Sequence, residues 1–291
     1  MKPFLKWVGG KTQIIDKVIS SFPKEMNSYY EPFLGGGSVL LALLSSDIKI
    51  MGDIYASDLN PNLIGLYINV QLHVDELITE VKILSDEYLA SNGTIINRKA
   101  TNLVEASTSP ESYYFWIRSR FNALSTEEKI SVPGSAMLLF MNKTGWRGLY
   151  REGPNGINVP FGNYKNPLIL DTIHIKAVSA LIQNVIFTCS SFKEVIPHIK
   201  EGDFVYLDPP YVPESEKSFV AYNASGFNKE DHLLLFQICN ELNNIKMVMS
   251  NADVPIVREA FSEFNICSIS CKRAIHSKNP GSKTNEALIS N

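Results

Sequence analysis

Apolar strand-like segments alternate with amphipathic segments at both ends of the chain, and this alternation constrains the fold most. Near the N-terminus the order is a helix over 13–21, a strand in SYYEPF, a helix in SVLLALL with Ser38 as a possible cap, and a strand in IYASDLN. Later strands are predicted in NVIFTC, FVYLDPPY and IKMVMSN, with a helix in KEDHLLLFQICNEL. FNICSIS and EALIS could pair at the sheet edge. The pattern predicts an α/β fold with a mostly parallel, doubly wound sheet.

Residues 59–166 interrupt this alternation. They begin with helical stretches and end in a segment, 142–167, that is dense in Gly, Asn, Pro and aromatic residues. Linkers rarely carry large side chains such as Trp146 and Phe161, so we expect an ordered hairpin on an inserted, mainly helical domain. We therefore predict one domain from 1–58 plus 167–291, and a second, inserted domain over 59–166.

Composition excludes several classes of protein. The 291 residues are 45% hydrophobic and 20% charged, as in globular proteins. No apolar run of roughly 18 residues and no signal peptide is present, which predicts a cytoplasmic protein without membrane contact. The four cysteines and scattered histidines lack metal-site spacing, so no metal is expected. The net charge of −3 means that nucleic-acid binding would need a local basic surface.

The segment LKWVGGKT, at 5–12, resembles the end of a phosphate-binding loop. That loop needs a glycine five positions before its second glycine, and Leu5 stands there instead. No hydrophobic strand precedes the segment either. A nucleotide hydrolase is therefore disfavoured, while a turn with a solvated lysine before a helix stays open.

The glycines of EPFLGGGS, at 31–38, come where an α/β sheet binds its ligand. A dinucleotide-binding fingerprint would place its third glycine where Leu40 stands, so NAD is disfavoured. Asp58 follows Gly37 by 21 residues, about the spacing at which an acid accepts hydrogen bonds from ribose. The pair suits an adenosine-containing cofactor, although a structural turn and a surface aspartate would look similar.

The stretch DPPY, at 208–211, indicates a site for a planar base that carries an exocyclic amino group. Pro209 and Pro210 make the backbone rigid and remove its N–H donors. Asp208 and the carbonyl of Pro209 can accept the two N–H bonds of an exocyclic amino group, while Tyr211 stacks on the ring. Drawing these hydrogens out of the ring plane localises the nitrogen lone pair, so the nitrogen becomes nucleophilic. A rigid turn with a capping aspartate is the alternative for DPP alone.

In this order, the motifs resemble those of the Dam-type DNA adenine methyltransferases: LKWVGGK, EPFLGGGS, ASDLN, NVPFGNYKNP, VYLDPPY, MSN and TNEALISN. The resemblance spans nearly the whole chain. It implies a Rossmann-like methyltransferase fold with an inserted target-recognition domain and S-adenosylmethionine as cofactor. It implies cofactor contacts for Trp7, Gly10, Lys11, Phe33, Gly35, Gly37, Asp58, Phe192 and Asp208.

A DNA surface is predicted on the inserted segment, because charge is segregated there. Residues 129–166 carry five basic residues and one acidic residue. Basic residues interleaved with aromatic ones suit phosphate contacts and insertion into the base stack. The predicted DNA-binding residues, several of them implied by the resemblance, are Lys6, Arg118, Arg120, Lys143, Trp146, Arg147, Leu149, Arg151, Pro160 and Lys165.

The resemblance also implies a target. Arg151 matches an arginine that contacts guanine, Leu149 an apolar contact to thymine, and Trp146 an aromatic that inserts beside the flipped adenine. GATC is favoured, but Arg147 stands where relatives that read GATC usually carry asparagine, so a site such as CATG stays open. We predict an adenine methyltransferase acting on double-stranded DNA, with a separately encoded restriction endonuclease as a possible partner. The alternatives are an RNA or protein-amide methyltransferase and a non-catalytic DNA-binding relative.

Overall fold

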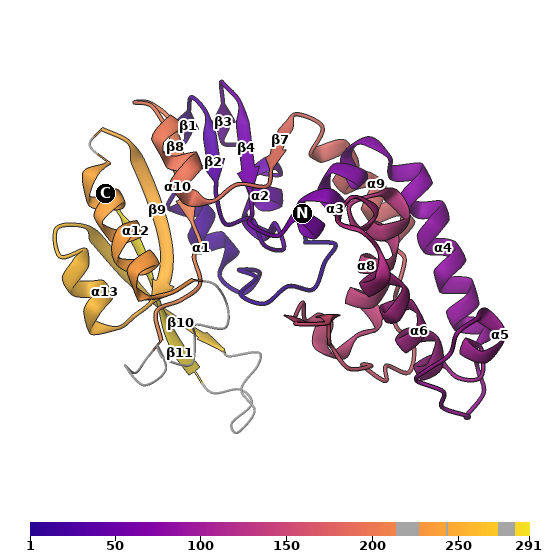
Figure 1. Ribbon diagram of the computed structural model, residues 1–291. Coiled ribbons are helices and arrows are strands. Elements are labelled where there is room, and N and C mark those ends of the chain that lie inside the picture. The colour runs from indigo at the N-terminus through magenta and orange to yellow at the C-terminus, as the bar shows by residue number, and fades with distance from the viewer. Residues whose placement is uncertain (214–226, 243, 273–282) are drawn as a thin grey trace. The chain divides into compact units, whose positions relative to one another are not determined.

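Figure 1 shows a computed structural model that describes residues 1–213, 227–242, 244–272 and 283–291. The chain forms two compact units. The first comprises Met1–Gly10, Gly35–Ser45 and Asn60–Cys189, and the second comprises Lys11–Leu34, Ser46–Leu59 and Ser190–Asn291. These limits follow contacts within the chain and differ from the domain limits expected from sequence. The functional division into a catalytic and a recognition domain stays a prediction.

The second unit is built on a sheet with the strand order β10-β11-β9-β8-β2-β4. Its parallel strands are β2 (Tyr29–Glu31), β4 (Ile54–Ser57), β8 (Phe204–Leu207) and β9 (Lys246–Ala252). Strands β11 (Lys283–Ser290) and β10 (Asn265–Lys272) add to β9 in antiparallel fashion. This confirms the mostly parallel sheet and the pairing of the last two predicted strands.

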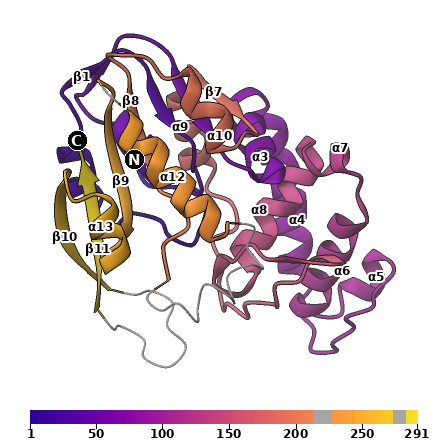
Figure 2. The ribbon, with the colours of Figure 1, turned by 60° about the vertical axis from the view of Figure 1, so that its left-hand side comes forward.

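Helices cover both faces of this sheet. On one face, Val205 and Leu207 of β8 share a core with α10 (Phe192–Val195), α12 (Lys229–Glu241) and α13 (Pro255–Ala260), and Figure 2 shows α12 lying along β9. On the other face, the ring of Phe22 packs against the rings of Phe204 and Tyr206. Phe22 follows α1 (Ile15–Ser20). Strand β8 is apolar throughout because both of its faces are buried.

Shorter elements complete this unit. Strands β1 (Glu25–Met26) and β3 (Lys49–Ile50) form a separate parallel pair, and the 3-10 turn η2 (Ile196–His198) extends α10.

The first unit is mainly helical (Figure 1). Its longer helices, α3 (Pro61–Leu72), α4 (Val74–Ala90), α6 (Pro110–Ala123) and α8 (Val132–Thr144), pack against one another. Side-chain caps from Asn60, Ser109 and Ser131 begin three of them, each with a proline in the first turn. The remaining elements are α2 (Ser38–Leu44), α5 (Leu103–Ala106), α7 (Thr126–Lys129), η1 (Trp146–Gly148), α9 (Thr172–Leu181) and β7 (Val185–Thr188).

The expected hairpin is present in the first unit. Strands β5 (Glu152–Gly153) and β6 (Gly156–Ile157) pair in antiparallel fashion. The side-chain amide of Asn122 on α6 donates to the carbonyl of Ile157 at 2.9 Å and accepts from its N–H at 2.8 Å. The hairpin is therefore fixed to a helix at its base.

One expectation about local structure is wrong. Ser38 is the first residue of α2 and not its cap, because Gly37 takes the cap position with a left-handed φ of 65°. A Cβ on Gly37 would lie 2.4 Å from the hydroxyl of Tyr67, so only glycine fits there. Within the described part of the chain, every helix is too short or too polar to cross a membrane.

Candidate functional site

Three of the expected site residues follow neighbouring parallel strands of the second unit. Asp58 comes directly after β4, Phe33 two residues after β2, and Asp208 directly after β8. Because the strands β4, β2 and β8 are adjacent and parallel, their carboxyl ends meet at one edge of the sheet. That edge is where open α/β sheets bind ligands.

Asp208 forms a buried ion pair with Lys11. The ammonium of Lys11 donates to Oδ2 of Asp208 at 2.7 Å, and the two side chains are 3% and 19% exposed. The other oxygen, Oδ1, is buried and has no hydrogen-bond partner among the described residues. Burial raises the pKa of Asp208 from its ordinary value of 3.8 to about 6, while Lys11 opposes the rise. Oδ1 is thus a desolvated acceptor available to a ligand.

Tyr211 is held from two sides. Its hydroxyl donates to Oε2 of Glu286 at 2.7 Å, and the ammonium of Lys11 lies 5.0 Å from the centre of its ring. Burial and the neighbouring carboxylates of Asp208 and Glu286 raise the pKa of Tyr211 well above its ordinary value, so the phenol is neutral. The next residue, Val212, donates its N–H to the buried side chain of Asn251 at 3.0 Å.

An aromatic cluster lies in the same unit. The rings of Phe33 and Phe192 stack with centroids 5.7 Å apart, and Phe227 contacts both. Phe192 is buried, whereas Phe33 is partly exposed. The structure therefore brings together two residues that were expected to contact the same cofactor. The N–H of Leu34, the residue after Phe33, donates to the carbonyl of Ser57, the residue before Asp58, at 2.9 Å.

In the first unit, Trp7 packs against the glycine loop. A Cβ on Gly35 would lie 3.1 Å from the indole ring, and one on Gly36 would lie 2.8 Å from Cβ of Trp7. The loop therefore needs glycine in order to approach the tryptophan. The indole also stacks on Tyr150, whose hydroxyl accepts from Asn62 at 2.9 Å and donates to Glu152 at 2.6 Å. Gly10, the other expected cofactor residue of this unit, is exposed.

Asn142, on α8, joins the N-terminal segment to the base of the hairpin. Its side chain accepts from the N–H of Lys6 at 3.0 Å and donates to the carbonyls of Lys6 and Gly148, at 2.7 and 3.0 Å. The neighbouring Lys143 directs its ammonium at the carbonyl of Phe4, and burial and the charge of Lys6 lower its pKa. Of the two lysines, Lys6 is the more exposed.

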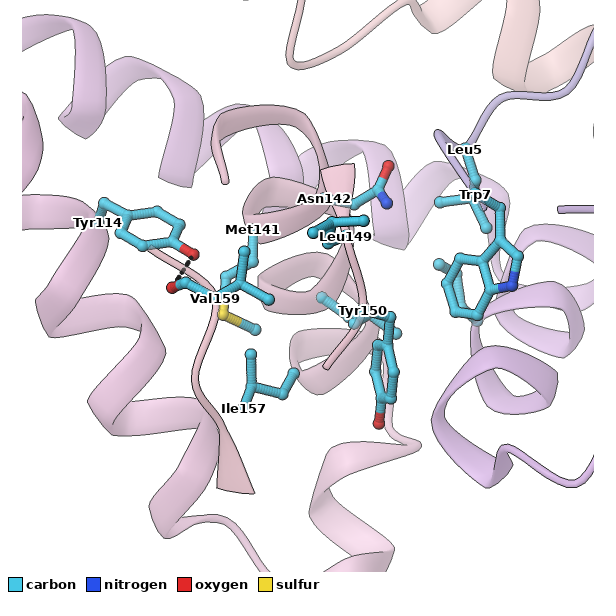
Figure 3. A pocket seen from close by; sticks show the side chains of 11 residues that line it. Leu5, Trp7, Tyr114, Met141, Asn142, Leu149, Tyr150, Ile157 and Val159 are labelled. Carbon is cyan, nitrogen blue, oxygen red and sulfur yellow. Dashed lines mark hydrogen bonds between the residues drawn. The ribbon is translucent and has the colours of Figure 1, made fainter. Parts of the chain in front are cut away.

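An apolar pocket lies beneath the hairpin in the first unit (Figure 3). On one side of the pocket, the hydroxyl of Tyr114 donates to the carbonyl of Val159 at 2.9 Å. On the other side, the rings of Trp7 and Tyr150 face each other. Leu149 lines this pocket, and a base-contacting role for it stays a prediction. The lining residues are Leu5, Trp7, Leu66, Tyr114, Leu138, Met141, Asn142, Leu149, Tyr150, Ile157 and Val159.

The expected DNA-reading residues lie at the surface of the hairpin region. Trp146 is 41% exposed, and the guanidinium of Arg147 stacks over its ring at 4.8 Å. Arg147 has a left-handed φ of 56°, and its N–H donates to the hydroxyl of Tyr164 at 2.7 Å. Arg151 is exposed, and its guanidinium donates to the side chain and the carbonyl of Asn158. Pro160 and Lys165 are exposed as well.

The two expected arginines of α6 differ in surroundings. Arg118 donates to the carbonyl of Val159 at 2.8 Å and stacks on Phe115, and burial lowers its pKa. Arg120 is exposed, with its guanidinium 4.8 Å from the ring of Trp116. Arg118 thus has a structural partner in the hairpin strand, whereas Arg120 presents its charge to solvent.

Three polar residues of these sites were not found by sequence reasoning: Glu286, Asn251 and Asn142. Each lies within a motif or segment that the sequence singles out, but a polar residue within a strand or helix does not show which distant group it contacts. Among the described residues, no group of three or more His, Cys, Asp and Glu side chains could hold a metal ion.

Comparison with known proteins agrees with this geometry. Residues 7–275 match the family described as D12 class N6 adenine-specific DNA methyltransferase. The chain is 36% identical to the Type II methyltransferase M.MjaIII of Methanocaldococcus jannaschii, over all of this chain and 99% of that protein. It is 30% identical to a DNA adenine methylase of Escherichia coli, over 99% of this chain and 94% of that protein.

Proposed function

Because the chain belongs to the D12 class of N6 adenine-specific DNA methyltransferases, we propose that it transfers a methyl group from S-adenosylmethionine to the exocyclic amino nitrogen of adenine in a short duplex site. One observation carries this proposal. Oδ1 of Asp208 is a buried acceptor without a partner in the described structure. Asp208 itself immediately precedes the rigid backbone of Pro209 and Pro210. An exocyclic amino group carries two N–H donors, so a buried site that binds it needs two hydrogen-bond acceptors.

The proposed chemistry follows from these acceptors. Oδ1 of Asp208 and the carbonyl of Pro209 accept the two N–H bonds of the target amino group. The nitrogen lone pair then no longer conjugates with the ring and can attack. Bound S-adenosylmethionine supplies an electrophilic methyl group on its sulfonium. After transfer the nitrogen loses one proton, which Asp208 can accept because its pKa lies near 6.

The cofactor assignment rests on the residues present. Asp58 follows β4 at the ligand-binding edge of the sheet, where a carboxylate can accept hydrogen bonds from ribose hydroxyls. Phe33, which is partly exposed and stacks on the buried Phe192, supplies aromatic surface in the same unit. The glycines of the loop let its backbone approach Trp7 closely. We assign cofactor contacts to these residues and, from the family resemblance, to Trp7, Gly10, Lys11, Gly35 and Gly37.

We propose that the target adenine is flipped out of the duplex. Its amino group is paired inside the double helix, so the base must leave the stack to reach Asp208. Lys11 occupies one face of the Tyr211 ring, and the flipped base would stack on the opposite face. Stacking and the amino hydrogen bonds partly offset the few kcal/mol that flipping costs.

For the target sequence we propose GATC, read in the major groove by the hairpin region. Arg151 projects from the start of the hairpin, and its contact with Asn158 holds the guanidinium in one orientation before DNA binds. A planar guanidinium matches O6 and N7 of guanine. Arg147 stacks on Trp146 and is a second candidate reader, and a CATG site is the outcome expected if it contacts another guanine.

The family favours adenine in DNA over the alternative acceptors, RNA and protein amides. A separately encoded restriction endonuclease is a proposed partner, since two relatives carry Type II methyltransferase names.

The test is methylation-sensitive sequencing of DNA from cells that express the chain, with the Asp208→Ala variant as control. We expect N6-methyladenine at one short sequence in the first culture and none in the second. In vitro, radiolabelled S-adenosylmethionine with DNA, RNA and protein acceptors should label duplex DNA alone. Label on RNA or protein, or methylcytosine in the DNA, would contradict the proposal.

A further inference from the structure

Glu286 makes the polar contact with the aromatic side chain of the DPPY stretch. The hydroxyl of Tyr211 donates to Oε2 of Glu286 at 2.7 Å, although 75 residues separate them in the chain. Glu286 lies on β11, opposite Ala252 of β9 and Ile269 of β10. It also lies beyond residues 7–275, the part of the chain that the family match covers. The backbone of Glu286 is therefore held by paired strands on both sides.

This contact completes the support of the Tyr211 ring. Lys11 lies over the ring at 5.0 Å and binds Oδ2 of Asp208 at 2.7 Å. Glu286 holds the hydroxyl at the edge of the ring. With the hydroxyl bound and one face covered, the ring keeps one orientation before DNA binds, so less conformational entropy is lost when a base stacks on the other face.

We propose that Glu286 is a positioning residue for methyl transfer, which fixes the Tyr211 ring in the orientation that stacks on the flipped adenine. This inference rests on the function proposed above. Glu286 acts through Tyr211 and does not itself touch the reacting atoms. Its carboxylate is needed as a hydrogen-bond acceptor, and an amide oxygen can replace it.

The charge of Glu286 gives the proposal a second, independent consequence. Its carboxylate is one cause of the raised pKa of Asp208, after burial. Replacing Glu286 by glutamine removes that charge and keeps an acceptor for the hydroxyl. The acid limb of the pH–rate profile should then move to lower pH, while the rate at its plateau stays close to that of the wild type.

The experiment is a double-mutant cycle with Glu286→Ala, Tyr211→Phe and the combined variant, together with Glu286→Gln. Single-turnover methylation is measured at saturating S-adenosylmethionine and duplex DNA. Fluorescence of 2-aminopurine at the target position reports stacking of the flipped base. Glu259→Ala, which removes an exposed carboxylate on α13 of the same unit, is the matched control. Thermal unfolding of each variant reports whether it folds.

We expect Glu286→Ala and Tyr211→Phe each to slow methylation about tenfold, the effect of one hydrogen bond, with altered 2-aminopurine fluorescence. The combined variant should be no slower than either single variant, and Glu286→Gln should restore most of the rate. Independent, multiplicative losses would overturn the inference, as would wild-type rate and fluorescence in Glu286→Ala. If Glu286→Ala does not fold, the inference still requires a slower rate in Tyr211→Phe and, in Glu286→Gln, a near wild-type rate with the acid limb at lower pH. A wild-type rate in Tyr211→Phe would then overturn it.

The wild-type rate distinguishes a failure of the proposed function from a failure of the role proposed for Glu286. Wild-type protein that does not methylate adenine in duplex DNA would overturn the proposed function and this inference together. Wild-type activity with a multiplicative cycle would overturn this inference alone.

Discussion

The indole of Trp7 stacks on the ring of Tyr150, with centroids 5.5 Å apart and planes inclined by 29°. The same indole limits the space at Gly35 and Gly36. One side chain therefore contacts both the glycine loop, assigned to the cofactor, and the residue before Arg151, assigned to base reading. Within this unit, replacing Trp7 should therefore affect the glycine loop and Tyr150 together.

We expect Trp7→Ala to lower the thermal unfolding midpoint and to weaken S-adenosylmethionine binding. Removing a large, partly buried ring costs about 2 to 4 kcal/mol through lost contacts and the cavity that remains. Trp7→Phe keeps an aromatic partner for Tyr150 and should lose much less. Differential scanning fluorimetry and calorimetric titration measure the two effects. An unchanged midpoint in Trp7→Ala would show that the stack contributes nothing to folding.

The pH dependence of methyl transfer should follow Asp208. Its carboxylate must be ionised to accept the amino hydrogens, and its pKa is raised to about 6. The rate should therefore rise with pH through about 6 and then level off. Replacing Lys11 by methionine removes the neighbouring cation and should move this limb to higher pH. A limb near pH 4 in the wild type would mean that Asp208 is better solvated than the structure shows.

The free energy of unfolding should also depend on the ionisation of Asp208, but it should fall as pH rises, whereas the rate rises. The folded-state pKa of Asp208 lies above the ordinary value of 3.8, so the folded protein prefers the protonated form. The contribution of this carboxyl to stability is fully present below pH 3.8 and is lost as pH rises through about 6. Comparing urea unfolding of the wild type and Asp208→Asn across this range isolates the effect. A difference that does not change with pH would contradict it.

Asp58→Ala should weaken S-adenosylmethionine binding by about 1 to 3 kcal/mol, the cost of removing one partner of a buried hydrogen bond. Methylation in a single turnover at saturating cofactor should change less, because Asp58 is assigned to the ribose of the cofactor and not to the amino group. Asp47→Ala, an exposed acid of the same unit, is the control for calorimetric titration. Equal affinities in wild type and Asp58→Ala would exclude Asp58 as the ribose ligand.

Arg151→Ala should relax discrimination at one guanine position by about 1 to 3 kcal/mol. Lys165→Ala, which removes an exposed charge outside the hairpin, should weaken all DNA sequences about equally. Sequencing of DNA methylated by each variant separates the two effects. If Arg151→Ala loses rate but keeps the full target sequence, this arginine contacts the backbone.

The sheet and its ligand-binding edge could be predicted from the sequence because both depend on local patterns. An apolar run such as 204–207, with two prolines soon after it, indicates a buried strand, and the residue after a parallel strand lies at the sheet's edge. Asp58 and Asp208 were found at the ends of predicted strands in this way, whereas Phe33 came from the family resemblance. The sequence also suggested that the last two strands could pair at the sheet edge, and they do.

Contacts between distant segments could not be predicted in the same way. Nothing in the residues around Glu286 shows that its carboxylate accepts from Tyr211, since the contact depends on the register of β11 against β9. Ser38 was placed wrongly because serine is the commoner cap, and the contact of Gly37 with Tyr67 decided otherwise. Likewise, Arg118 and Lys143 are basic in sequence, and only the structure shows their backbone partners.

The bonds between Lys6 and Asn142 bear on the order in which the protein is completed during synthesis. They join the backbone of Lys6 to a side chain that is made 136 residues later. At the usual 5 to 20 residues per second, the N-terminal segment waits roughly 7 to 30 s for this partner, and longer for Asn142 to clear the ribosome. The segment that carries Trp7 therefore gains these hydrogen bonds only after α8 has emerged. A truncated product that stops before α8 would leave this segment without its Asn142 partner.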